Sequence, residues 1–151
     1  SGFCPVAACL NAGINVALGT DGAASNNDQD MLAEMRTAAL LAKGVSGNAS
    51  AVSAMQALKM ATINGAKALG LDDEIGSLSI GKAADIVAID LSDVETQPVF
   101  NPLAQFVYAA SRHQVSDVWI AGKRVLNKRQ LTTLDLHELR HRTEAWQRRL
   151  A

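Results

Sequence analysis

The sequence predicts an α/β protein, and the patterns of two regions support this. Residues 1–70 contain a short apolar run at residues 14–18, which ends in a Gly-rich polar turn and is followed by helical patterns. This is the order of a βα unit. Residues 71–134 consist mostly of short strand patterns separated by turns, and residues 135–151 have the pattern of a terminal helix. A helix-rich βα part is therefore expected to precede a strand-rich part.

The first elements are a helix and a strand. Pro5 suits the first turn of a helix, and Gly13 suits its end. Residues 14–18 (Ile-Asn-Val-Ala-Leu) are predicted to form a strand that ends at the turn of residues 19–22 (Gly-Thr-Asp-Gly). Strands of this kind belong to parallel sheets, which are normally buried on both faces, so its edges would need neighbouring strands.

Two helices are expected next. The first is predicted over residues 28–43, with Asn27 as its N-cap and Gly44 as its stop. Its buried face is expected to hold Met31, Leu32, Met35, Ala39 and Ala42. The second is predicted over residues 50–69 and ends at Gly70. Its apolar side is expected to hold Val52, Met55, Leu58 and either Ala61 or Thr62.

The second part contains shorter elements. Residues 86–89 (Ile-Val-Ala-Ile) are predicted to form a strand, and residues 102–110 a short helix. Residues 115–120 and 124–126 flank a Gly-containing turn, which predicts a β-hairpin. Asp135 is expected to cap the final helix. The apolar stripe of that helix is Leu136, Leu139, Thr143, Trp146 and Leu150.

The composition is that of a folded protein. Of the 151 residues, 48% are hydrophobic and 19% are charged, so a core can form. No apolar run reaches the ~18 residues expected of a transmembrane helix, and no signal-peptide pattern is visible. The two cysteines, Cys4 and Cys9, do not suggest a disulfide framework. These features favour a cytoplasmic protein without a membrane partner.

The net charge of −1 is unevenly distributed. Residues 1–111 contain 5 Lys or Arg and 11 Asp or Glu, whereas residues 112–151 contain 9 and 4. The basic residues alternate with apolar ones at helix or strand spacing. This favours a solvated face, or one that docks on the acidic part, over a nucleic-acid site. Nucleic acid is therefore not an expected partner.

Asp21 is the most informative residue. It follows the C-terminal end of the predicted strand, in a Gly-Thr-Asp-Gly turn. In α/β barrels this end of the strands is where catalytic groups gather. Aspartate also caps turns and helices routinely, so its position alone fits a structural role equally well.

Four stretches carry a family resemblance. Residues 19–27 (Gly-Thr-Asp-Gly-Ala-Ala-Ser-Asn-Asn) and 35–43 resemble the amidohydrolase superfamily, and most closely its methylthioadenosine/S-adenosylhomocysteine deaminase branch, which also contains chlorohydrolase-annotated relatives. Residues 60–70 resemble the helix after the last barrel strand of that group. Residues 76–87 (Gly-Ser-Leu-Ser-Ile-Gly-Lys-Ala-Ala-Asp-Ile-Val) resemble the return into its small β-sandwich. The resemblance covers nearly the whole chain.

The resemblance implies a more specific fold. Residues 1–70 would be the last βα portion of a metal-dependent-hydrolase TIM barrel, a (β/α)8 barrel. Residues 71–134 would be the C-terminal part of a composite β-sandwich, with a helical return near residues 101–112. Residues 135–151 would form a terminal helix.

The resemblance also implies roles for site residues. Asp21 corresponds to the aspartate at the end of barrel strand 8, which in the family binds or abuts a zinc-type metal and takes a proton from the attacking water. The chemistry is reasonable, because a divalent metal lowers the pKa of bound water and a nearby carboxylate can accept the proton. In the family, the loop of Asn26 and Asn27 borders the substrate pocket.

Most of the family's metal site has no counterpart in this sequence. The family's histidine ligands precede the last strand, whereas His113, His137 and His141 all follow the barrel part. One carboxylate cannot hold a catalytic zinc, which usually has three protein ligands. A complete barrel needs ~200 residues or more. The isolated chain is therefore expected to be inactive and to lack an N-terminal barrel segment, and its start at Ser1 without Met suggests cleavage or an excerpt.

A second metal motif occurs near the end of the chain. Residues 137–141 (His-Glu-Leu-Arg-His) fit the H-E-x-x-H pattern of zinc proteases. Little sequence follows His141, so a downstream third ligand has no room. The histidines are expected beside the solvent face of the terminal helix, which favours two exposed residues over a metal site.

The resemblance thus implies a zinc-dependent parent enzyme, a homo-oligomer, that deaminates an aminopurine nucleoside such as methylthioadenosine or S-adenosylhomocysteine. A sister reaction stays open: deamination of guanine or 8-oxoguanine, or triazine dechlorination. A non-catalytic, truncated scaffold fragment also stays open. A third alternative is a barrel completed by a separate N-terminal fragment that pairs with residues 14–18.

Overall fold

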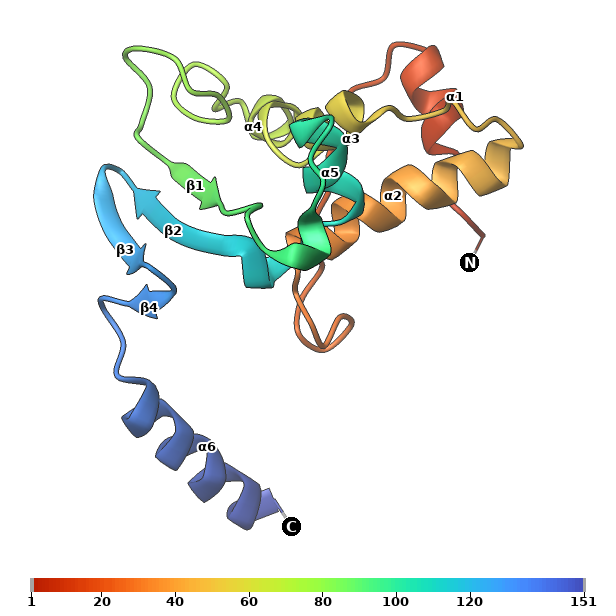
Figure 1. Cartoon of the computed structure of the whole chain (residues 1–151). Helices are drawn as coiled ribbons and strands as arrows, with labels where there is room; N and C mark the ends of the chain where they lie inside the picture. The colour runs from red at the N-terminus through yellow and green to blue at the C-terminus, as the bar shows by residue number, and fades with distance from the viewer. Residues whose placement is uncertain (1, 151) are drawn as a thin grey trace.

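The computed structural model describes residues 2–150, which form a helical part, a small sheet and a projecting terminal helix (Figure 1). The helical part contains α1 (Val6–Asn11), α2 (Met31–Ser46), α3 (Ala54–Met60), α4 (Ile63–Leu69) and α5 (Pro102–Tyr108). The chain is therefore mixed helix and strand, as the sequence predicts, and the predicted helix near residue 102 is confirmed with an earlier end.

The sheet is antiparallel, with the strand order β1-β2-β3-β4. Its strands are β1 (Ile86–Ile89), β2 (Val115–Ile120), β3 (Lys123–Asn127) and β4 (Gln130–Leu131). The predicted hairpin is confirmed, since Ile120 pairs with Lys123 across a two-residue turn. Ala121 and Gly122 both have positive φ (48° and 75°), which is the requirement of the type I′ turn that suits twisted strands. Two short 3-10 helices, Val94–Thr96 and Arg112–Gln114, connect the sheet with α5.

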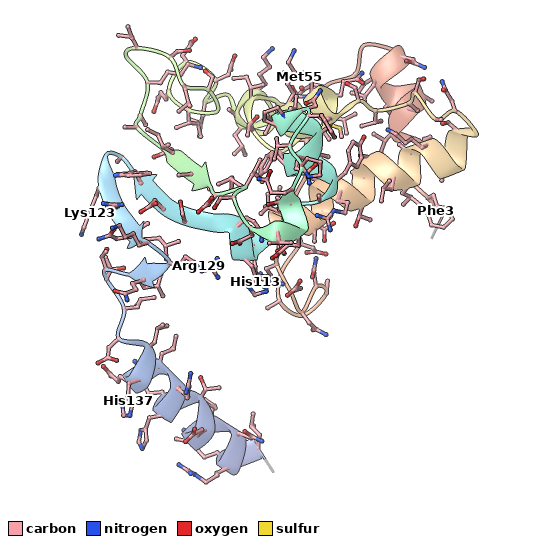
Figure 2. The ribbon with its side chains drawn as sticks, in the orientation of Figure 1. Phe3, Met55, His113, Lys123, Arg129 and His137 are labelled. Atoms are coloured by element: carbon pink, nitrogen blue, oxygen red, sulfur yellow. The ribbon has the colours of Figure 1, made fainter. Side chains whose placement is uncertain are left out.

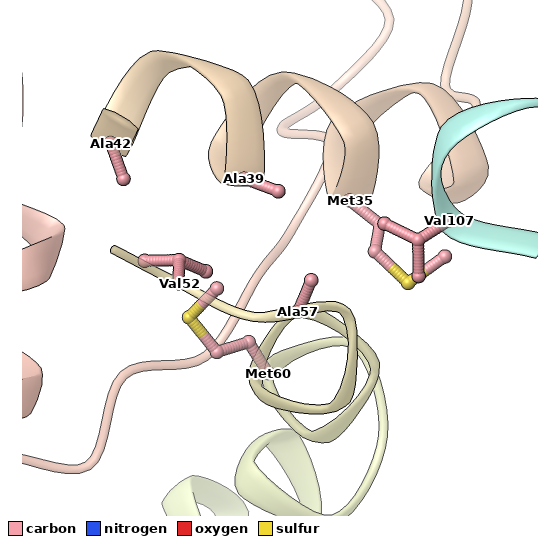
Figure 3. Close-up of a cluster of buried hydrophobic side chains, with 7 residues drawn as sticks. All are labelled: Met35, Ala39, Ala42, Val52, Ala57, Met60 and Val107. Carbon is pink, nitrogen blue, oxygen red and sulfur yellow. The ribbon is translucent and has the colours of Figure 1, made fainter. Parts of the chain in front are cut away.

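The core lies between α2, α3 and α5 (Figure 3). Met35, Ala39 and Ala42 of α2 are buried, as predicted. On the facing side, Met60 is 0% exposed, whereas Met55 is 48% exposed. The predicted face of the second helix is confirmed for Val52, which is buried, and for Leu58 and Ala61, which pack against the core. It is wrong for Met55, and Ala57 and Met60 are buried in addition.

The predicted boundaries of α2 are also wrong. Gln29 has a φ of 48°, which is incompatible with a helix, so α2 begins at Met31. Asp30, not Asn27, is the N-cap: its Oδ1 accepts hydrogen bonds from the amides of Leu32 (2.9 Å) and Ala33 (3.3 Å). Gly44 lies inside the helix, and the left-handed Gly47 ends it.

The single helix predicted over residues 50–69 is two helices. Thr62 adopts φ −133° and ψ −100°, which breaks the chain into α3 and α4. Ser53 caps α3 in a reciprocal capping box with Gln56, so this helix begins later than predicted. Gly70 ends α4 with a left-handed φ of 69°, as predicted.

Residues 14–18 form no strand, so this prediction is wrong for the chain as described. Their bonds go to helices instead: the amide of Leu18 donates to the carbonyl of Met60 (3.0 Å), and Asn64 Nδ2 donates to the carbonyl of Val16 (2.9 Å). Val16 and Leu18 are half-buried, while Ile14, Asn15 and Ala17 are exposed. Burial thus alternates only from Asn15 to Leu18, and no neighbouring strand is present within residues 2–150 to form a ladder.

The terminal helix α6 (Leu136–Leu150) points away from the rest of the described chain (Figure 1). Asp135 caps it as predicted, accepting from the amides of His137 (2.8 Å) and Glu138 (3.2 Å). Its apolar stripe is exposed: Trp146 is 56% accessible. None of the helices described between residues 2 and 150 has the length and apolar character needed to span a bilayer.

Candidate functional site

Asp21 lies at the tip of the turn that follows residues 14–18. It is exposed, and its φ of 62° is left-handed, a conformation that Asp tolerates better than most residues. One carboxylate oxygen, Oδ1, accepts a hydrogen bond from the amide of Gly22 (2.7 Å). The hydroxyl of Thr20 donates to the Asp21 carbonyl (3.0 Å). The carboxylate is thus oriented by its own turn, and Oδ2 can still accept a proton or bind a cation.

The turn after Asp21 is closed by local bonds. The carbonyl of Gly22 accepts from the amides of Ser25 and Asn26, both at 2.9 Å. The side chain of Asn26 continues the network in two directions. Its Oδ1 accepts from the amide of Asp28 (3.0 Å), and its Nδ2 donates to Glu34 Oε1 on α2 (2.7 Å).

The two asparagines predicted beside the pocket, Asn26 and Asn27, therefore differ in exposure and in bonding. Asn26 is half-buried and shapes the loop from within. Asn27 is exposed, and its predicted capping role belongs to Asp30. A contact of either residue with a substrate stays a prediction.

Sequence reasoning missed two arginines that hold this region to the second half of the chain. The guanidinium of Arg112 forms an ion pair with Asp28, and its Nε lies 3.3 Å from Asp30 Oδ2. The hydrogen bond to Asp28 and the charges of both aspartates raise the pKa of Arg112 above its usual value. Arg36 of α2 donates to the carbonyls of Val107 (3.4 Å) and Ala110. The only sequence signal for Arg112 was the basic excess after residue 111, and Arg36 had none.

The described residues do not fit a complete zinc site. Between residues 2 and 150, no three His, Cys, Asp or Glu side chains are grouped so that they could hold a metal ion. Asp21 could contribute one carboxylate, which is less than the three protein ligands typical of catalytic zinc. His137 and His141 are exposed on α6, in agreement with the expectation of two solvent-facing residues. Figure 2 shows His137 on this helix.

Two surface hollows lie at the opposite end of α2. Residues of α1 and the end of α2 line both. The loop after α2 contributes to the first, which includes Leu10 and Val52, and Pro5 before α1 contributes to the second. Asp21, Asn26 and Asn27 line neither of them. The candidate site is therefore an exposed loop rather than an enclosed pocket of the described residues.

Comparison with known proteins identifies relatives that are longer than this chain. A protein from Teredinibacter turnerae named 5-methylthioadenosine/S-adenosylhomocysteine deaminase is 53% identical over 150 residues, which are 99% of this chain and 34% of that protein. A protein of the same name from Moorella thermoacetica is 50% identical over 92% of this chain and 32% of its own length. The chain thus spans about a third of the curated relatives that it matches.

Solved structures also match this chain over about a third of their own length. A zinc-bound adenosine deaminase from Xanthomonas campestris superposes with a TM-score of 0.95 and 53% identity, over 99% of this chain and 34% of that one. The zinc complex of atrazine chlorohydrolase from Arthrobacter aurescens superposes with a TM-score of 0.87 and 32% identity, over 95% and 32%. The Amidohydrolase family model matches residues 1–125. The resemblance to the deaminase branch is thereby confirmed, and the chain belongs to the amidohydrolase family.

Proposed function

We propose that this chain forms the C-terminal third of a metal-dependent hydrolase that deaminates aminopurine nucleosides of the methylthioadenosine/S-adenosylhomocysteine type. The observation that carries the proposal is the 53% identity, over 99% of this chain, to a relative named for that activity. Specificity within the superfamily varies between sister enzymes, so identity at this level is a stronger argument than the shared fold.

The proposal includes an assignment of the parts. Residues 1–70 would be the last βα portion of a (β/α)8 barrel, with residues 14–18 as its final strand. Residues 71–134 would be part of a composite β-sandwich with a helical return near residues 101–112, and residues 135–151 a terminal helix. The lack of a described strand partner for residues 14–18 supports this, because a barrel would supply strands on both sides.

Asp21 is the residue of this chain that we assign to the chemistry. Its free carboxylate oxygen would accept a proton from the attacking water and pass it towards the departing amine, while the Gly22 amide holds the other oxygen. Bound zinc would lower the pKa of that water, and its remaining ligands would come from an N-terminal segment that precedes this chain in the enzyme. Asn26 and Asn27 would border the substrate.

A sister activity is the second candidate. Atrazine chlorohydrolase shares 32% identity and a TM-score of 0.87 with this chain, so a triazine substrate is compatible with the same loop. Guanine or 8-oxoguanine deamination is a further variant. A truncated scaffold without catalysis is the alternative from another class, and the lack of a metal-ligand cluster within residues 2–150 is the observation that favours it.

The test requires an enzyme with a complete site. A chimera supplies it: this chain is joined to the N-terminal two thirds of the Teredinibacter turnerae relative, and this chimera is called the full-length enzyme. Ammonia or chloride release is measured with methylthioadenosine, S-adenosylhomocysteine, guanine, 8-oxoguanine and a chlorotriazine. We expect the first two to be preferred and on the order of one zinc to be bound per chain. Purified residues 1–151 alone should bind no stoichiometric zinc and release no ammonia.

The role of Asp21 is tested in the same enzyme. Asp21→Asn keeps the shape of the side chain but removes its basicity, so kcat should fall by roughly 10²- to 10⁴-fold. Asp73→Asn, at an exposed carboxylate after α4, is the matched control and should leave kcat unchanged. Near-normal kcat in Asp21→Asn would disprove the assignment, and a uniformly inactive but zinc-loaded wild-type enzyme would disprove the proposed activity.

A further inference from the structure

The loop of residues 19–30 is shaped by bonds between its own neighbours. Asp21 accepts from Gly22 (2.7 Å), and the carbonyl of Gly22 accepts from the amide of Asn26 (2.9 Å). The longest of these local links joins Asn26 to Glu34, eight residues further along the chain. Such bonds set the shape of the loop, but they do not determine where it lies relative to the rest of the molecule.

Arg112 provides a link of a different kind. It comes from a segment 84 residues beyond Asp28, and its guanidinium contacts both Asp28 and Asp30. Of the polar side-chain contacts described for residues 2–150, this is the one that reaches the loop from outside residues 19–34. The position of the loop therefore depends on Arg112 more than on any other polar side chain.

The segment that carries Arg112 is itself well anchored. Gln114, which is 4% exposed, accepts from both the amide and the hydroxyl of Ser111, at 2.8 and 2.9 Å. The backbone carbonyl of Gln114 accepts from the amide of Asp90, next to β1 (2.8 Å). On the other side, the carbonyl of the buried Ala110 accepts from Arg36 of α2. Arg112 thus extends from a fixed base between the sheet and the helical core.

Asp30 connects this base to the start of α2. Its side chain is 10% exposed, and its two oxygens have separate partners: Oδ1 caps the helix, and Oδ2 lies 3.3 Å from Arg112 Nε. The side chains of Arg112 and Asp28 are 50% and 58% exposed. Because the Arg112–Asp28 pair is this exposed, it contributes little to folding stability, and the contact with the mostly buried Asp30 is the better shielded part of the link.

We propose that Arg112 is a positioning residue for the reaction: by holding Asp28 and Asp30, it keeps the loop that carries Asp21 in its productive place. The inference rests on the proposed function, in which Asp21 transfers the proton. Proton transfer requires heavy atoms within hydrogen-bond reach, and a displacement of about 1 Å can reduce a rate by on the order of 10²-fold. Arg112 does not itself touch the reacting atoms in this proposal.

The test compares four variants of the full-length enzyme. Arg112→Ala should lower kcat by roughly 10-fold or more, while KM changes by less than about 3-fold, because substrate contacts are retained. Arg112→Lys should recover part of the lost rate, since Lys keeps the charge but cannot contact both aspartates as a planar fork. Asp28→Asn should also lower kcat. The double variant should have the kcat of Arg112→Ala alone, because both changes break the same contact.

The matched control is Arg124→Ala. Arg124 also pairs with an aspartate, Asp117, and stacks on Trp119, but it lies on the sheet away from the loop. The Arg124→Ala variant should be less stable than the unmodified enzyme but should keep its kcat. Melting temperatures of all four variants and the control separate stability from rate. Should Arg112→Ala prevent folding, Asp28→Asn and Arg112→Lys still report on the link.

The outcomes separate the two proposals. If Asp21→Asn is inactive but Arg112→Ala, Arg112→Lys and Asp28→Asn have the kcat of Arg124→Ala, Arg112 has no positioning role, whatever its effect on melting. If Asp21→Asn retains full activity, the proposed function itself fails. A loss of kcat in Arg112→Ala, partly rescued by Lys and not additive with Asp28→Asn, supports the positioning role.

Discussion

Met60 and Met55 allow a sharp test of the packing, because the same residue type occurs twice in α3 in opposite environments. Met60 is 0% exposed and packs in the core with Val52 and Met35, whereas Met55 is 48% exposed (Figures 2 and 3). Truncation to Ala at either position removes Cγ, Sδ and Cε. The two variants therefore differ in burial rather than in chemistry.

The expected magnitudes follow from that burial. Loss of the buried end of Met60 costs about 2.5 kcal/mol in transfer free energy, at roughly 0.8 kcal/mol for each methylene-sized group. The cavity left behind adds to this, so the free energy of unfolding should fall by about 3 kcal/mol or more, within the roughly 2–5 kcal/mol typical of Met→Ala. Met55→Ala should cost less than about 1 kcal/mol, because much of the side chain is in water and Ala favours the helix.

The assay is urea unfolding of the 151-residue chain, followed by far-UV circular dichroism, with equal m-values as the condition for comparison. Amide exchange of Leu18 should also accelerate in Met60→Ala, because that amide donates to the Met60 carbonyl. Equal losses of stability in the two variants would refute the orientation of α3 and, with it, the core between α2, α3 and α5.

Two further predictions concern stability. Gly76 has a φ of 84°, and a Cβ there would lie 2.7 Å from Ala66 Cβ, whereas a Cβ at Gly70 would meet no atom within 4 Å. Gly76→Ala should therefore lower the unfolding free energy by about 1–3 kcal/mol more than Gly70→Ala. Equal losses in urea titrations would contradict the close contact. The Lys128 amide, Arg124 and Ser116 lower the pKa of Asp117 from 3.8 to about 2. Because this folded-state pKa lies below the unfolded one, the stabilisation is present above about pH 4 and is lost as the pH falls towards 2. Urea titrations at pH 7, 4 and 2 should therefore show a smaller loss in Asp117→Asn than in the wild-type chain, and identical losses would exclude this contribution.

Local signals in the sequence predicted several elements well. The hairpin of β2 and β3 and the start of α6 at Asp135 depend on interactions within a few residues, a two-residue turn and a side-chain cap. The strand β1 was visible as a short apolar run, although its pairing partner, β2, is distant in the sequence. The loop motif around Asp21 was equally visible, because a Gly-rich turn after an apolar run is a local pattern. The family resemblance needed no tertiary information, and the family match confirmed it.

Other features depended on contacts between distant residues. The sequence placed Met55 on the apolar side of its helix, and only the packing of α3 against α2 shows that Met60 is buried and that Met55 is 48% exposed. Residues 14–18 have a strand-like sequence, but a strand requires a partner, and in the described chain their bonds go to Met60 and Asn64.

The sequence by itself determined the family, the loop that carries Asp21, and the elements whose caps and turns are local. The tertiary structure alone decided what holds that loop in place. Arg112 and Asp28 are 84 residues apart, and no spacing or periodicity connects them. Their contact exists because the core formed by α2 and α5 brings the segment after α5 back to the start of α2, where Asp30 caps the helix. Side chains distant in sequence meet only through such packing, so this link could be found only in the folded chain.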